Sequence, residues 1–418
     1  MTPHQTENGT VDDTVSDHRG TAPDNRAARL SGNLSGTNLE RAGDYNLRTV
    51  LQAVRLTPGT TRVDIARQTG LTAPTIANIT GRLVDMGLVS VTGRRQGGRG
   101  QPALQLEVNA DGAFAIGLNI DRDHLTLVTL DLAGTVRSRI RRETAFALPR
   151  DVVEFVRAEL DRAIDHADID RSRILGIGIA IPDDIGRIAL PHRPADYDRW
   201  NETDVATLLA AEWPWPVHCD NDAAAAALGE AEYGTAFDNP NFFYMLISAG
   251  LGGGVVIDRS YHRGATARSG EIGLMPDHGA GPDAIVQDTV SVSALLARIE
   301  AAGHTIVAID ELATADGAIA GIVDDWLADA VRSLVQPLTA INCLLNPDAI
   351  LIGGRLPLPL IERLAAHLTV ALDTIRLPAR AKIMPAVMAE DAPEIGAAIL
   401  PFLDHLLPSD AILIQAGR

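Results

Sequence analysis

Apolar residues recur at helical spacing around residue 50 and predict an amphipathic helix. Its stripe occupies positions i, i+3, i+4 and i+7, which are filled by Leu47, Val50, Leu51 and Val54. The Pro58-Gly59 pair that follows is typical of a helix end. The stripe predicts one buried side, so we expect this helix to pack on neighbouring elements.

A second short helix is expected directly afterwards. Thr61 and Asp64 form a near capping box, which places the start of the helix at Thr61. We expect Val63, Ile65 and Ala66 to supply its buried side, and Gly70 to break it. The pattern predicts a tight glycine turn at this point.

A third helix is predicted from Thr72, a suitable N-cap, to Met86, before Gly87. Its buried side is expected to hold Ile76, Ile79, Leu83 and Met86. Helix, glycine turn and helix form the helix-turn-helix plan. The outward face and the N-cap then supply the candidate DNA-reading residues, Thr72, Pro74, Thr75, Asn78 and Arg82.

Two alternating apolar runs, Leu88–Val91 and Leu104–Val108, flank a loop of glycines and arginines. They predict a β-hairpin wing whose Arg94, Arg95 and Arg99 suit phosphates or a narrow minor groove. We therefore expect an α+β winged helix-turn-helix domain over residues 36–108, after a disordered tail over residues 1–35. The alternative is a small helical cap whose arginines are only solvated.

From residue 109 onward strands and helices alternate, which predicts an α/β body. We expect two lobes, 109–220 and 221–418, with the last helix returning to the first lobe and a ligand cleft between them. The expected strands are 114–120, 124–132, 174–181, 217–219, 242–248, 254–257 and 349–352, and the expected helices are 152–164, 222–233, 322–345 and 394–406.

Composition and charge narrow the classes of function. Only two cysteines occur, which excludes a disulfide framework, and the most apolar stretch, 241–257, is too short and glycine-rich for a membrane span. No export signal is visible, so we expect a cytoplasmic protein. The net charge is −18, yet residues 41–102 carry nine arginines against three aspartates. This asymmetry favours a nucleic-acid-binding module on an acidic body, although local composition in a chain with one lysine is the alternative.

Three stretches of the body carry chemistry. Ser248–Gly254 is a strand, glycine turn and strand that lets a ligand approach main-chain N–H groups. Asp220–Asp222 lies where a strand meets a helix, a place that favours a carboxylate. Gly270–Gly273 holds a glutamate between glycines. Each alone is also compatible with an ordinary turn or an N-cap.

The order of these pieces resembles the ROK family, whose sugar kinases and sugar-responsive repressors share one actin-like, ribonuclease H-like body of two lobes. The winged helix implies the repressor branch, because the kinases of the family lack it. The resemblance rests on GTNLERAGDYNLRTVL, the helix-turn-helix, GRGQPALQLEVNADGAFAIG, VHCDNDAAAAALGEAEYG, SAGLGGGVVIDRSYHRGATARSGEIG and NPDAILIGG.

Departures from the family pattern argue against phosphoryl transfer. The kinases open with a phosphate loop Asp-x-Gly-Gly-Thr, whereas this chain has Asn119-Ile-Asp121-Arg122-Asp123, and Ala249 replaces the threonine of the second phosphate loop. Acidic residues beside a triphosphate would repel it. The family zinc ligands are also missing, because Leu274 stands at the histidine position and no cysteine follows nearby. We therefore predict neither a cofactor nor a metal site.

The resemblance implies a ligand site in the cleft. Asp222 matches the catalytic base of the family, Glu271 its sugar-binding glutamate, and Asp196 a position often held by asparagine; Gln287 is matched to a later glutamate. Without phosphate machinery, we expect Asp222 to accept a hydrogen bond from a hydroxyl. The predicted ligand-binding residues are Asp196, Asn221, Asp222, Gly252, Gly253 and Glu271.

The sequence therefore predicts a repressor that binds a double-stranded DNA operator as a homodimer or homotetramer and responds to a small carbohydrate or polyol. The alternative in another class is an ATP-dependent sugar kinase with a fused DNA-binding head. A third reading is an architectural DNA-binding protein whose body binds no ligand.

Overall fold

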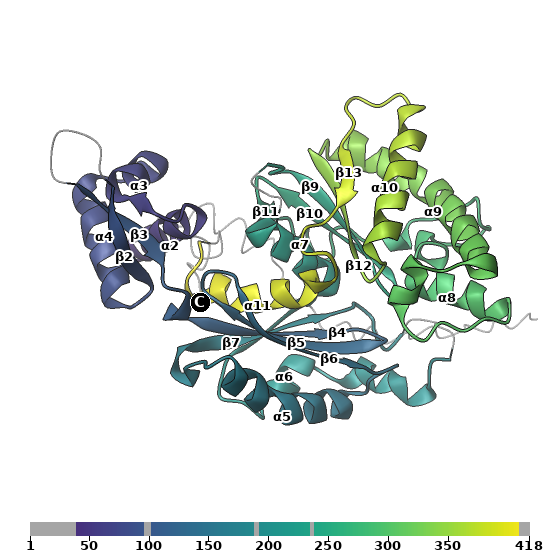
Figure 1. Cartoon of the computed structure of the whole chain (residues 1–418), viewed down its shortest axis with the longest axis horizontal. Coiled ribbons are helices and arrows are strands. Elements are labelled where there is room, and N and C mark those ends of the chain that lie inside the picture. The colour runs from purple at the N-terminus through teal and green to yellow at the C-terminus, as the bar shows by residue number, and fades with distance from the viewer. Residues whose placement is uncertain (1–38, 96–101, 188–191, 235–237, 409–418) are drawn as a thin grey trace, which may run out of the picture.

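The computed structural model describes residues 39–95, 102–187, 192–234 and 238–408. Over these ranges, an N-terminal head lies at one end of a larger body made of two lobes (Figure 1). The expected tail and Arg99 of the wing lie outside the described residues. No helix among the described residues is long and apolar enough to cross a membrane.

Within its described residues, the head contains three helices and a small antiparallel sheet in the order β1-β3-β2. Strands β2 and β3 pair as the predicted hairpin. The bounds are α2 Leu39–Leu56, β1 Thr60–Thr61, α3 Arg62–Thr69, α4 Ala73–Asp85, β2 Val89–Arg95 and β3 Ala103–Val108.

The local signals in the head act as the sequence predicted, with two exceptions. Thr61 and Asp64 form a complete capping box on α3, and the Thr72 side chain caps α4. The predicted burial of Val63 and Met86 is wrong, because their exposed fractions are 63% and 52%. Val63 lies in the first turn of α3, a helix whose core-facing side holds Ile65 and the partly buried Ala66, and Met86 follows the last turn of α4.

The first lobe is built on a five-stranded sheet in the order β6-β5-β4-β7-β8. Two hairpins give the antiparallel part, and β7 and β8 add in parallel beside β4. In Figure 1, α5 and α6 lie along one face of this sheet. The bounds are β4 Phe114–Ile120, β5 His124–Asp131, β6 Val136–Glu143, α5 Pro149–His166, β7 Ile174–Ile181, α6 Val205–Ala210 and β8 Val217–Asn221.

The second lobe repeats this topology with the order β11-β10-β9-β12-β13. Again two hairpins are followed by two parallel strands. The helices α8, α9 and α10 belong to this lobe (Figure 1). The bounds are β9 Phe242–Ile247, β10 Leu251–Ile257, β11 Ser260–Tyr261, α8 Val292–Ala301, α9 Gly317–Leu344, β12 Ala349–Gly354, α10 Leu358–Asp373 and β13 Lys382–Pro385.

The glycine run of the second lobe lies in a strand, which corrects the predicted turn. β10 begins at Leu251, so the chain reverses at residues 248–250 and Gly252–Gly254 pair with β9. Glycine is needed there because neighbouring chain segments come close. A Cβ on Gly252 would lie 2.7 Å from the Cβ of Ala223, and one on Gly253 would lie 2.5 Å from the carbonyl oxygen of Gly270.

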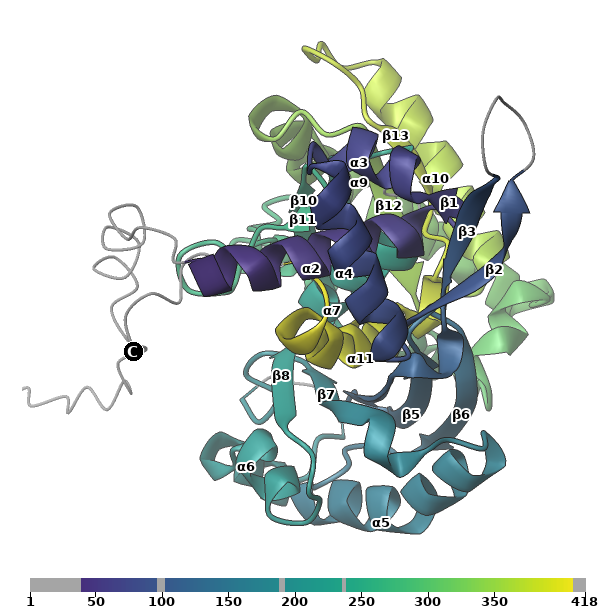
Figure 2. The ribbon, with the colours of Figure 1, turned by 90° about the vertical axis from the view of Figure 1, so that its left-hand side faces the viewer.

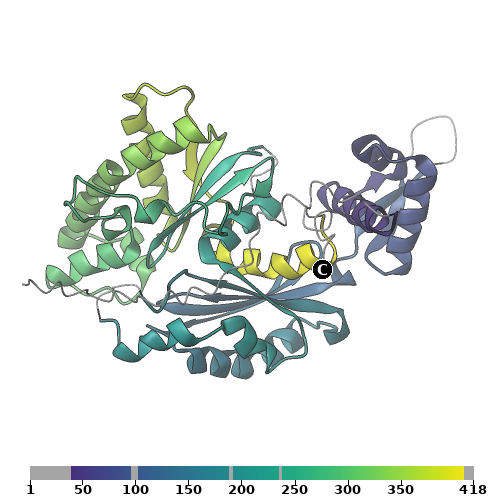
Figure 3. The same cartoon turned by 180° about the vertical axis from the view of Figure 1, so that it is seen from behind.

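Two helices, α7 Asp222–Tyr233 and α11 Ala392–His405, lie between the sheets (Figures 1 and 3). Every residue of α11 from Ala392 to Phe402 is buried. The helices cross with their backbones in close approach: a Cβ on Gly396 would overlap the carbonyl oxygen of Ala225, and one on Gly229 would lie 2.9 Å from the carbonyl oxygen of Ala392. The last helix thus packs on the sheet of the first lobe and on α7.

The head packs on these same two helices. Its α2 lies on the side nearest the body and α4 on the far side (Figures 1 and 2). Buried residues of α2, including Leu47 and Val50, share one apolar cluster with Ile399 and Phe402 of α11 and Leu228 of α7. The head is therefore docked on the body through a continuous core.

The helix crossing generates a stability prediction. Replacing Gly396 by alanine should lower the free energy of unfolding by about 1–3 kcal/mol or more, because the added methyl group overlaps the backbone of α7. Gly321→Ala on α9 is the matched control. Nothing lies within 4 Å of its added Cβ, so it should raise the free energy of unfolding by about 0.5–1 kcal/mol. Denaturant unfolding measures both; equal effects would contradict the close crossing.

Candidate ligand-binding cleft and DNA-facing surface

A cavity of about 250 Å³ lies between the two lobes. It is lined by the segments that follow β4 and β7, the end of β8 with the start of α7, the β9–β10 turn, the loop before Ile272, and Leu274 and Gln287. The lining residues are Arg122, Pro182, Asp183, Asp184, Arg187, Asn221, Asp222, Ser248, Gly250, Leu251, Gly252, Arg268, Glu271, Leu274 and Gln287.

The N-terminus of α7 forms one wall of the cavity. The Oδ1 atom of Asn221 accepts hydrogen bonds from the N–H groups of Ala223 at 2.9 Å and Ala224 at 3.1 Å, so Asn221 is the N-cap. Asp222 is buried, and this burial, reinforced by the charge of Asp121, raises the pKa of its carboxyl to about 7. At neutral pH the group exists in both forms and can donate or accept a hydrogen bond.

Three carboxylates and one arginine form the opposite wall. Arg268 Nε lies 3.1 Å from Asp183 Oδ2, its Nη2 donates to Asp184 Oδ2 at 2.9 Å, and its Nε lies 3.5 Å from Glu271 Oε1. Burial raises the pKa of Asp183 to about 6, against the opposing charge of Arg268. The wall therefore offers several acceptor oxygens, held in position by one guanidinium.

The sequence reasoning missed Asp183 and Asp184. The signal was present, because both follow Pro182 at the carboxyl end of the buried parallel strand β7. Ligands of α/β folds bind at this edge of a sheet. No motif includes these residues. Their position directly after a buried strand is the signal that could have identified them.

The predicted glycines have different roles. Gly252 lines the cavity, whereas Gly253 is buried and does not. Gly253 and Gly270 pack backbone against backbone, and Gly270 has φ +97°, a conformation that favours glycine. This contact places the loop that carries Glu271 against β10. The glycine pair therefore positions Glu271.

The predicted site residue Asp196 does not line the cavity. It lies exposed on a short 3₁₀ helix, Ala195–Glu202, whose Tyr197 and Trp200 are buried in the core of the first lobe. Burial of these aromatic rings fixes the helix with Asp196 toward solvent. The prediction that Asp196 belongs to the ligand site is therefore wrong for this cavity.

Arg122 occupies the turn that matches the first phosphate loop of the family. Its side chain is 7% exposed and reaches the β9–β10 turn, since a Cβ on Gly250 would lie 2.9 Å from Arg122 Nη1. The main-chain N–H of Arg122 donates a hydrogen bond to Asp121 Oδ1 at 2.7 Å. The guanidinium therefore fills the space between the two turns that match the phosphate loops.

The neighbouring Asp123 is held by a histidine and an arginine. It contacts His124 Nδ1 at 2.6 Å and forms an ion pair with Arg355 of the second lobe, and these partners hold the pKa of its carboxyl at about 2, against the opposing effect of burial. Asp123 is thus ionised at neutral pH and links the lobes beside the cavity.

The candidate DNA-reading residues mostly share the outer surface of α4. Thr72, Pro74, Asn78 and Arg82 are exposed, and Thr75 is half-buried with its Oγ1 2.8 Å from that of Thr72. On the wing, Arg94 is exposed, while Arg95 Nη1 donates to Asp64 at 2.8 Å. Arg95 is thus anchored to the start of α3.

A family model of the ROK family matches residues 115–402, which is more than half of the chain. The chain belongs to the ROK family. A second model, winged helix-turn-helix DNA-binding, matches residues 44–90. The predicted winged head and actin-like body are thereby confirmed.

Three similar proteins include two regulators and one kinase. The xylose repressor of Bacillus subtilis is 25% identical over 241 residues, 57% of this chain and 62% of the repressor, so the match spans only part of that protein. A ROK family transcriptional regulator, described as a homolog of the E. coli MLC protein, has a TM-score of 0.66, 22% identity and coverage of 90% and 100% of the two chains. A ROK glucokinase from Streptomyces griseus has a TM-score of 0.53, 21% identity and coverage of 69% and 99%. Both structures share its fold.

The buried carboxyl of Asp222 generates a pH prediction. Its pKa in the folded protein, about 7, exceeds the ordinary value of 3.8, so folding favours the protonated form. This contribution to the free energy of unfolding is present in full below pH 4 and is lost as the pH rises through 7. Asp222→Asn should therefore reduce the loss of stability between pH 5 and pH 8.

Chemical denaturation at both pH values measures this difference. Asp325→Asn, an exposed position on α9, is the control and should leave the pH dependence unchanged. The same pH dependence in wild type and Asp222→Asn would contradict the assignment.

Proposed function

We propose that this ROK protein is a sequence-specific DNA-binding transcriptional regulator, a repressor, controlled by a small carbohydrate or related polyol in the cleft. The observation that carries the proposal is the path of α7. Its first residue, Asp222, lines the cavity, and its last turn holds the winged head through Glu232 and Tyr233.

The DNA-binding part of the proposal rests on the face of α4 that points away from the body. Asn78 can bond to the edge of a base, and Arg82 can bond to guanine or to a phosphate. Arg94 at the end of β2 adds a cation on the wing. The body leaves this surface of the head uncovered (Figure 2).

The ligand part rests on the oxygen atoms of the cavity. One wall offers the carboxyl of Asp222, and the other offers those of Asp183 and Glu271. Their oxygen atoms can accept hydrogen bonds from several hydroxyl groups. The cavity of about 250 Å³ lies slightly below the usual range of ligand sites, about 300–1,000 Å³, which suits a single sugar ring. Similarity to xylose repressors makes xylose the first probe.

The proposed coupling between the cleft and the head rests on the C-terminal ends of α7 and α11. Arg55 of α2 pairs with Glu232 and lies 4.7 Å over the ring of Tyr233, at the end of α7. Arg48 of α2 donates to the carbonyl oxygen of Asp404 at 2.7 Å, at the end of α11. A ligand that favours one arrangement of the lobes shifts these crossed helices and thereby the head. We propose that ligand binding relieves repression.

The proposed regulator does not transfer phosphate. Arg122 fills the space beside Gly250 that the phosphates would need, and Asp121 and Asp123 replace residues of the phosphate loop. The alternative is a sugar kinase with a fused head, which the likeness to a glucokinase and the retained Asp222 favour. No cofactor is part of the proposal.

The proposal also covers the domain bounds and the number of subunits. We propose a head over residues 36–108 and lobes over 109–220 and 221–418, with the C-terminal helix returned to the first lobe. Symmetric operators require a two-fold arrangement of heads, which a homodimer or homotetramer supplies. A regulator of this kind acts in the cytoplasm.

Substitutions on α4 test the DNA-binding part of the proposal. A duplex fragment selected from a random library by the full chain serves as the operator probe. Asn78→Ala or Arg82→Ala should weaken binding to it by about 1–3 kcal/mol, because a groove contact is lost. Arg332→Ala, an exposed arginine on α9, is the control and should bind as wild type. Equal affinity of all three variants would remove α4 from the interface.

Thermal unfolding with added sugars tests the ligand part of the proposal. Xylose and a panel of pentoses, hexoses and polyols are added to the full chain during thermal unfolding. A ligand at 100 times its Kd should stabilise wild type by about 2.7 kcal/mol. Glu271→Gln should lose most of this gain, whereas Asp325→Asn should keep it.

Two outcomes would contradict this part of the proposal. One is the absence of stabilisation by every sugar in the panel. The other is formation of a sugar phosphate with ATP at enzyme-like turnover, which would favour the kinase alternative.

A further inference from the structure

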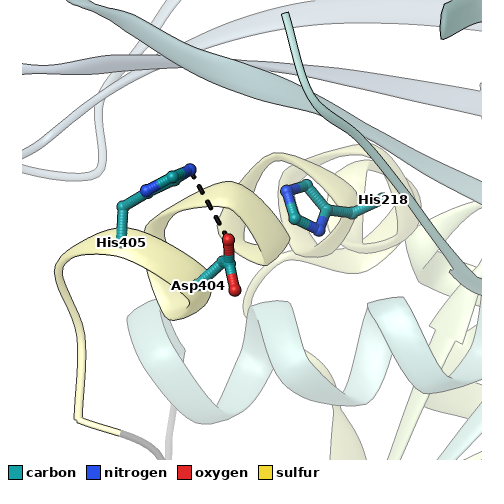
Figure 4. Close-up of side chains that lie close together, drawn as sticks. All are labelled: His218, Asp404 and His405. Atoms are coloured by element: carbon teal, nitrogen blue, oxygen red, sulfur yellow. Dashed lines mark ion pairs between the residues drawn. The ribbon is translucent and has the colours of Figure 1, made fainter. Parts of the chain in front are cut away.

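A cluster of two histidines and one aspartate lies outside the cleft. His218 belongs to β8, and Asp404 and His405 lie at the C-terminal end of α11 (Figure 4). One ligand atom of each residue lies within 4.8 Å of the others, and His405 Nε2 is 3.5 Å from Asp404 Oδ2. The cluster occupies the beginning of β8, whereas Asp222 follows the other end of that strand.

One nitrogen atom of this cluster is buried without a hydrogen-bond partner in the described part of the chain. The Nε2 atom of His218 is shielded from solvent and has no hydrogen-bond partner among the described residues. A buried polar atom without a partner costs free energy, so native proteins rarely leave one. A bound ion at this point would engage the cluster that His218 shares with Asp404 and His405.

The distances suit a metal ion after small side-chain movements. Bonds of Zn²⁺ to imidazole nitrogen and carboxylate oxygen are about 2.0–2.2 Å, so two ligand atoms on one tetrahedral ion lie about 3.4 Å apart. Asp404 and His405 are exposed, and rotation of their side chains can close the remaining gap.

We propose that His218, Asp404 and His405 bind a divalent transition metal ion of the Zn²⁺ class. Two imidazoles and one carboxylate are a donor set that zinc prefers, and water completes the coordination. This site is separate from the cysteine-containing zinc loop of the family. It also revises the sequence-based prediction of no metal site, which considered only that loop.

A metal ion at this position would link the first lobe to the segment that holds the head. The ion joins β8 of the first lobe to the end of α11, where Arg48 of the head donates to the carbonyl oxygens of Leu403 and Asp404 at 3.3 and 2.7 Å. Metal binding therefore stiffens the segment that holds the head. The site does not depend on the proposed function of the cleft.

The test is calorimetric titration of Zn²⁺ into the full chain after removal of metal with EDTA. His218→Ala and His405→Ala should each weaken the tightest Zn²⁺ binding at least about tenfold. His367→Ala, an exposed histidine on α10, is the matched control and should bind as wild type. The chain has eleven histidines, so the comparison between variants decides the site.

A spectroscopic readout uses Co²⁺ in place of Zn²⁺. Wild type and His367→Ala should show intense visible absorption of a low-coordinate site, and His405→Ala and Asp404→Asn should lose it. Both latter changes are at exposed side chains, so the fold should survive, and thermal unfolding in EDTA verifies this. Zn²⁺ affinity equal to that of wild type in His405→Ala and Asp404→Asn would overturn the proposal.

Discussion

The close crossing of α7 and α11 is the constraint on which the arrangement of this protein depends. At Gly396 and Gly229 no side chain separates the helices, so the two backbones pack directly. The N-terminus of α7 then reaches the cleft, and the far ends of both helices reach α2 of the head. A shift of one lobe against the other therefore acts on the contacts that hold the head.

Charge determines what the cleft can bind. Its carboxyls cluster around Arg268, and burial keeps Asp222 and Asp183 near their titration points at neutral pH. Such groups suit neutral hydroxyl groups better than polyphosphates. Arg122 strengthens this distinction, because its side chain occupies the volume that glycines of a phosphate loop would leave open. These local side-chain differences on a shared fold are the basis for the proposal that the cleft binds a ligand without transferring phosphate.

Sequence reasoning was most accurate where local chemistry fixes the chain. Asn221 caps α7, and this helix has the predicted bounds Asp222–Tyr233. The strand β6 was missed because arginines interrupt its apolar pattern at an edge of the sheet. Asp196 was misplaced because the family resemblance supplies a sequence position and does not tell which way a short 3₁₀ helix faces. The Arg122 contact escaped for a similar reason, since it joins turns about 130 residues apart.

The central claim is that the cleft and the head are energetically coupled. The most direct test is to measure the operator affinity with and without saturating sugar, and the sugar affinity with and without operator DNA. The account predicts that sugar weakens operator binding at least about fivefold and that DNA weakens sugar binding by the same factor, since linkage is reciprocal. Operator affinity that is the same at every sugar concentration, for a sugar that binds, would contradict it.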